Sequence, residues 1–104
     1  MHITPDFIRT KIDKQSYEIS LHADDERIAD GLTVSQLEFA LSNCEVIEHY
    51  QDDPRGESCL AMGLTLEGIA VHIVCGKNPS EQLILITVYI TTTPKWRDPY
   101  TRNR

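Results

Sequence analysis

The chain has 104 residues, of which 40% are hydrophobic and 25% charged, so it fits one small domain with a single core and has no room for a second. No apolar run reaches the roughly 20 residues of a membrane span, and the first residues lack the basic and apolar segments of a secretory signal. We therefore expect a cytoplasmic protein without membrane contact.

The net charge of −6 is unevenly spread, with thirteen acids against three bases in residues 15–94 and four bases against one acid in the last ten residues. An acidic body repels a nucleic-acid backbone unless local basic groups dominate the contact.

Three helices and a short strand are predicted in the first half of the chain. Thr4-Pro5-Asp6 is typical of a helix start, and this helix should end near residue 14. Tyr17 to Ser20 is predicted as a short strand, and Ser20 should cap a second helix over roughly 21–30 that ends at Gly31. Thr33 and Gln36 form a capping box for a third helix that ends near Asn43.

Four strands are predicted in the second half, over residues 44–50, 58–65, 69–75 and 83–90. Their short connections favour an antiparallel meander, so we predict an α+β fold with the helices on one face of a four-stranded sheet. The expected organisation is an N-terminal helix in 1–16, an α+β domain in 17–94 and a basic tail in 95–104.

The run from Leu83 to Ile90 is the most strongly β-patterned stretch of the chain. Alternation should direct its even-numbered residues to the helices: Ile84, Ile86, Val88 and Ile90. Their expected core partners come from the two preceding strands: Leu60, Met62 and Leu64 from one, and Val71 and Ile73 from the other. The uncovered face should then carry Thr87, Tyr89 and His72, with Cys59, Ala61 and Thr65. This face is either a binding surface or an ordinary half-solvated one.

Cysteine and metal motifs point to no cofactor. The three cysteines (Cys44, Cys59 and Cys75) are widely spaced, so we expect reduced, half-buried thiols and no disulfide. His72 and Cys75 should point to opposite faces of their strand, which argues against shared zinc ligation. Cys-x-x-Cys pairs, Gly-rich phosphate loops and Gly-x-Ser-x-Gly elbows are missing from the sequence.

His22 and Arg27 are the candidate catalytic pair. An imidazole can act as a general base and a guanidinium can brace a phosphate, which is enough to cleave RNA through its own 2′-hydroxyl without a metal. Five residues on an ideal helix turn through about 140°, so the pair converges only if His22 lies in the entry turn and Arg27 reaches back. The alternative is that His22 forms a local hydrogen bond while Arg27 pairs with Asp24 or Glu26.

An ordered series of motifs resembles a small bacterial family of unknown function. The series begins with Ser20-Leu-His-Ala-Asp-Asp-Glu-Arg-Ile and Gly31-Leu-Thr, continues through Asp52-Asp53-Pro54-Arg55-Gly56, Ser58-Cys59-Leu60 and Val71-His72-Ile-Val-Cys75, and ends with Thr87-Val-Tyr89 and Pro94-Lys95-Trp96. That family is grouped with the barnase, EndoU, colicin and RelE-like nucleases. Some of its members resemble toxins encoded beside a small zinc-knuckle antitoxin.

The resemblance implies a RelE-like fold and assigns roles to matching residues. His22 would be the base and Arg27 the phosphate stabiliser, with Thr87 and Tyr89 contributing from the sheet. Independently of the resemblance, we expect four further residues to contribute to binding: Arg55, His72, Lys95 and Trp96. In many members the arginine follows the histidine by four residues, whereas here Glu26 holds that position and Arg27 comes next.

Two hypotheses follow from these observations. The first is a RelE-like toxin-type domain, an endoribonuclease that cleaves RNA without metal or did so ancestrally, and that pairs with a zinc-knuckle antitoxin. The second is a non-catalytic interaction module whose open sheet face and basic tail bind a partner protein or a second copy of the chain, with Trp96 as an anchor.

Overall fold

A computed structural model describes residues 3–52, 54, 56–91, 96–98 and 101–102, which form three helices and two sheets. The helices and the short strand of the first half are α1 (Pro5–Asp13), β1 (Tyr17–Ile19), α2 (Leu21–Ala29) and α3 (Val34–Ser42). The remaining elements are β2 (Glu45–Tyr50), β3 (Ser58–Leu64), β4 (Ala70–Lys77), β5 (Leu83–Ile90), β6 (Trp96–Asp98) and β7 (Thr101–Arg102). None of the helices described is long and apolar enough to span a membrane.

The helix starts follow the capping residues. The side chains of Thr4, Ser20 and Thr33 each accept a hydrogen bond from a backbone N–H of the first turn of α1, α2 and α3, respectively. Thr33 and Gln36 form a complete capping box. These local signals confirm the three predicted helices.

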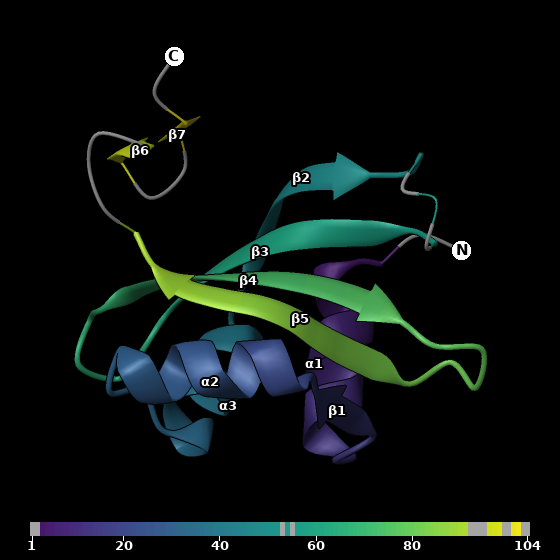
Figure 1. Ribbon diagram of the computed structural model, residues 1–104, viewed down its shortest axis with the longest axis horizontal. Helices are drawn as coiled ribbons and strands as arrows, with labels where there is room; N and C mark the ends of the chain where they lie inside the picture. The colour runs from purple at the N-terminus through teal and green to yellow at the C-terminus, as the bar shows by residue number, and fades with distance from the viewer. Residues whose placement is uncertain (1–2, 53, 55, 92–95, 99–100, 103–104) are drawn as a thin grey trace.

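The main sheet has five strands in the order β1-β5-β4-β3-β2 (Figure 1). Strands β2 to β5 form the predicted antiparallel meander, and the α+β class is confirmed. The prediction of four strands is wrong because β1 pairs in parallel with the first half of β5, from Tyr17 opposite Leu83 to Ile19 opposite Leu85. The three helices lie on one side of this sheet (Figure 1).

A bulge in β5 changes which residues face the helices. Val74 lies opposite Thr87 and Cys75 lies opposite Leu85, so Ile86 is an extra residue that reverses the alternation. Leu83 and Leu85 are therefore in the core, while Val88 and Ile90 join it as predicted. The predicted core positions of Ile84 and Ile86 are wrong.

Strand β3 is also inverted relative to the prediction. Its core side carries Cys59 and Ala61, whose partners in β4 are Cys75 and Ile73, whereas Leu60 and Met62 lie on the face away from the helices. Small residues face the helices here because α3 packs directly on the strand. A Cβ at Gly63 would overlap the carbonyl oxygen of Ala40 in α3.

The face away from the helices contains buried side chains. Leu60, Met62 and His72 are almost fully buried although they point away from the main core. The predicted solvent exposure of His72 is therefore wrong. The open face has its own small buried layer.

Candidate functional site

Helix α2 lies along the edge of β5 and replaces a neighbouring strand. Beyond the end of β1, the Ser20 hydroxyl donates to the carbonyl oxygen of Ile86 at 3.0 Å. Glu26 Oε1 accepts the backbone N–H of Val88 at 3.0 Å, and Asp30 Oδ2 accepts the N–H of Ile90 at 3.4 Å. Polar side chains spaced along the helix thus satisfy the strand edge, which protects it from pairing with another chain.

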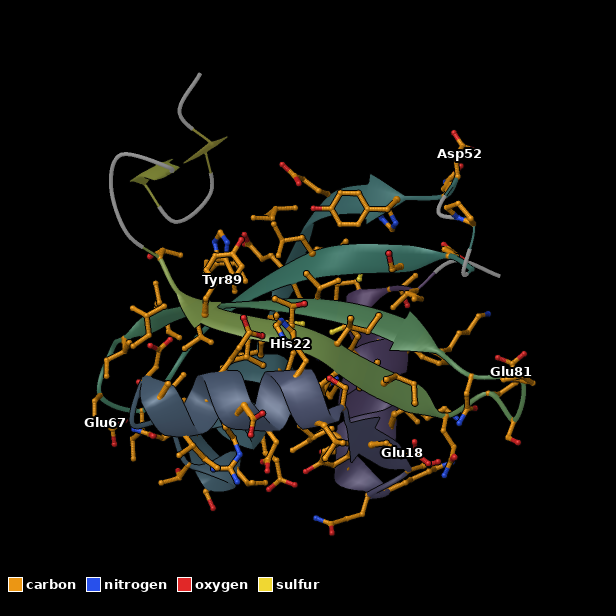
Figure 2. All side chains as sticks on the ribbon, in the orientation of Figure 1. Glu18, His22, Asp52, Glu67, Glu81 and Tyr89 are labelled. Carbon is orange, nitrogen blue, oxygen red and sulfur yellow. The ribbon has the colours of Figure 1, made fainter. Side chains whose placement is uncertain are left out.

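His22 lies beside this edge and is open to solvent. Its side chain is 69% exposed, and Nε2 lies 3.3 Å from Glu26 Oε1, the oxygen that also accepts the Val88 N–H. Figure 2 shows His22 on the side of β5 that faces α2. One carboxylate oxygen therefore connects an exposed imidazole to the sheet edge and restrains its position.

Arg27 has other partners. Its Nε donates to Asp24 Oδ1 at 2.7 Å, and its Nη1 donates to the carbonyl oxygen of Leu32 at 3.1 Å, with only 20% of the side chain exposed. The pairing with Asp24 that the sequence offered as the alternative is present. The guanidinium holds the end of α2 to the following loop and is not directed at His22.

His72 and Tyr89 form a pair on the opposite face of the sheet. They are direct cross-strand partners, His72 Nδ1 lies 3.2 Å from the Tyr89 hydroxyl, and the rings meet edge to face with centroids 5.2 Å apart. His72 is fully buried, and Tyr89 is half-buried. This geometry is typical of a buried histidine whose ring is fixed by a tyrosine.

The predicted site residues thus fall into two groups. His22 belongs to the α2 side of β5, whereas Tyr89 projects from the other side in Figure 2, and the half-buried Thr87 lies opposite Val74 on that same face. Arg55 and Lys95 lie outside the described residues, and Trp96 is described only as the first residue of β6.

Sequence reasoning missed the role of Glu26. The four-residue spacing of His22, Glu26 and Asp30 would have indicated a common helix face, because residues four apart are neighbours on a helix. The local pattern does not predict that this face of α2 contacts β5, because that contact joins residues about sixty positions apart.

The three thiols are free and buried next to one another in the core. Burial raises the pKa of Cys44 to about 11, and a hydrogen bond with Cys59, followed by burial, raises the pKa of Cys75 well above its ordinary value. High-pKa thiols are poor nucleophiles, so they are suited to packing.

Within the described part of the chain, His, Cys, Asp and Glu side chains form no group of three that could hold a metal ion.

Comparison with known proteins gives one family. Residues 19–90 match the model of DUF4258, which is described as a domain of unknown function. Curated proteins gave no match, and solved structures gave none. The matched segment runs from the end of β1 to the end of β5, so it contains α2, α3 and the antiparallel strands of the sheet. Since it covers well over half of the chain, the protein belongs to the DUF4258 family.

Proposed function

We propose that the chain is a RelE-like toxin-type domain that cleaves RNA without a metal ion and is held in check by a small zinc-knuckle antitoxin. The motif resemblance motivates this proposal. The observation that carries it is the solvent-exposed His22 held by Glu26 at the edge of β5. A restrained imidazole that solvent can reach can serve as the general base of such a reaction.

The reaction is an attack by the RNA 2′-hydroxyl on the adjacent phosphorus. The P–O2′ bond forms, the P–O5′ bond breaks, and a 2′,3′-cyclic phosphate is left on one product. His22 accepts the 2′ proton, and its imidazolium form can return a proton to the departing 5′-oxygen. Glu26 is a positioning residue because it fixes the orientation of the imidazole.

The phosphate needs a positive group from outside α2. Arg27 is bonded to Asp24 and to the Leu32 carbonyl, so we do not assign it to phosphate. We assign that contact to the basic C-terminal segment, of which Lys95 is the member predicted to bind.

The test is cleavage of messenger RNA, both free and ribosome-bound, by the purified chain in the presence of EDTA. We expect cyclic-phosphate products and a loss of roughly 100-fold or more in His22→Ala, the usual range for removing a general base. Asp25→Ala is the matched control, because it removes an exposed side chain from the same helix. If the unaltered chain does not cleave either RNA, or if His22→Ala cleaves equally well, the proposal is wrong.

An alternative is a non-catalytic interaction module. It is favoured by the engagement of Arg27 within the fold and by large apolar side chains that α3 and the β3–β4 turn expose to solvent. A chain that forms a stable protein complex and leaves RNA intact would support it.

A further inference from the structure

Three large apolar side chains are exposed where α3 meets the β3–β4 turn. Phe39 is 42% exposed, Leu64 is 47% exposed and Leu66 is 75% exposed. Phe39 and Leu66 line two adjoining hollows of about 420 and 400 Å³, and Leu64 lines the first of them. We call this surface, defined by these three residues, the Phe39 groove. Exposed apolar clusters of this kind mark interaction sites more often than isolated exposed residues do.

The groove is held in a fixed shape. The close approach of α3 to β3 at Gly63 sets the distance between the helix and the strand. Gln36 Nε2 donates to Glu67 Oε1 at 3.0 Å, which ties α3 to the turn, and Thr65 N donates to the Ile69 carbonyl at 2.9 Å within the turn. A preformed surface loses little conformational entropy when a partner binds.

The charged residues of the groove are acidic. Glu45 lines one hollow and Glu67 lines the other, and neither hollow has a lysine or arginine among its described lining residues. The hydrogen bond from Gln36 is the main cause that lowers the pKa of Glu67, so this carboxylate is ionised at neutral pH. A fitting partner therefore carries an apolar anchor next to basic side chains.

The last eleven residues of this chain have that chemistry. They include two aromatic residues, Trp96 and Tyr100, and four basic residues against one acid. The chain also leaves the sheet at the groove, because Thr91 N donates to the Ala70 carbonyl at 3.3 Å and Ala70 lies opposite Leu64. Figure 1 shows the β3–β4 turn and the end of β5 at the same end of the sheet.

We propose that the Phe39 groove binds the basic C-terminal segment of a second copy of this chain, which gives a homodimer with exchanged tails. A two-fold axis near this end of the sheet would bring each tail to the groove of the other copy. The proposal deepens the interaction-module alternative, in which the C-terminal segment binds protein and not phosphate. It does not depend on RNA cleavage.

Sedimentation of the full chain over a range of concentrations tests the proposal. The informative variant is Leu66→Lys, which removes the most exposed apolar contact and places a positive charge where the basic segment should bind. Leu21→Lys is the matched control, since Leu21 is 85% exposed on α2, away from the groove. Both positions are exposed, so neither substitution should prevent folding, and circular dichroism checks this.

We expect a dimer for the unaltered chain, at least tenfold weaker association for Leu66→Lys and for the chain in high salt, and no change for Leu21→Lys. Trp96 is the only tryptophan, so its emission should shift to longer wavelength when the dimer is diluted. A monomer at all concentrations would overturn the proposal. A dimer that Leu66→Lys leaves intact would overturn it as well, because the interface would then lie elsewhere.

Discussion

Replacing Glu26 by alanine should weaken the contact between α2 and β5. The Glu26 carboxylate accepts the Val88 N–H at 3.0 Å, and its side chain is only 28% exposed. Without it, Val88 keeps a backbone donor at the strand edge that no neighbouring strand can satisfy, since β1 pairs only as far as Leu85.

The expected cost follows from the type of hydrogen bond. A hydrogen bond to a charged group contributes about 1.5–3 kcal/mol. For a domain of this size, each kcal/mol lowers the midpoint of thermal unfolding by roughly 4 °C. Glu26→Ala should therefore lower that midpoint by roughly 6–12 °C. Glu26→Gln keeps an oxygen acceptor and should lose about half as much, since neutral hydrogen bonds are about half as strong.

Thermal unfolding and amide hydrogen exchange measure the effect. Asp25→Ala is the control, because Asp25 is exposed on the same helix. The Val88 amide should exchange faster in Glu26→Ala than in Asp25→Ala, while amides in the middle of β4 should change only with global stability. Equal melting of the two variants, with unchanged exchange at Val88, would refute the role given to Glu26.

Three further predictions concern the core and its titrating groups. Gly63→Ala should destabilise the fold by about 3 kcal/mol in urea unfolding, because the added Cβ would overlap the backbone of α3. It should cost more than the control Gly68→Ala, where the added Cβ meets no atom within 4 Å and only the φ of +86° strains the alanine. Burial, followed by a hydrogen bond to Glu38, raises the pKa of Tyr17, so the fold should lose stability as the pH rises above the ordinary value of 10.0. Tyr17→Phe should reduce this loss in alkaline denaturation curves, and the buried thiols account for the part that stays. All three thiols, including Cys75, should resist a thiol reagent in the native state and react after unfolding in guanidinium.

The parts of the fold that depend on local sequence were predictable. Caps at Thr4, Ser20 and Thr33 mark helix starts because the capping bond joins residues three positions apart. The four meander strands follow from period-two patterns and short turns. In both cases the physical cause lies within a few residues of the element.

The parts that depend on distant contacts were not predictable. The three-residue strand β1 finds its partner more than sixty residues away, and the bulge at Ile86 exists only relative to β4. The inward orientation of Cys59 and Ala61 depends on the close packing of α3 at Gly63. Apolar pattern alone favoured the larger Leu60 and Met62 for the core, because it takes no account of the space that a helix requires.

In the candidate site, too, features that depend on local sequence were predictable and features that depend on distant contacts were not. The sequence indicated His22 and Arg27 as candidates, and it also offered the local pairing of Arg27 with Asp24 as an alternative, because both possibilities lie within one helix. The burial of His72 depends on neighbouring strands and on side chains of the open face, so a strand pattern could only assign it to a face.

The acidity of α2 has a structural cause that limits where a phosphate could bind. A carboxylate only accepts hydrogen bonds, which suits Glu26 and Asp30 to the exposed N–H groups of β5. An arginine at position 26 would offer only donors to the Val88 N–H and leave it unsatisfied. Neither Glu26 nor Asp30 can therefore be exchanged for a phosphate-binding cation without weakening the sheet edge. Any cation that stabilises a phosphate near His22 must come from another segment, and the basic C-terminal residues are the largest excess of positive charge in the chain.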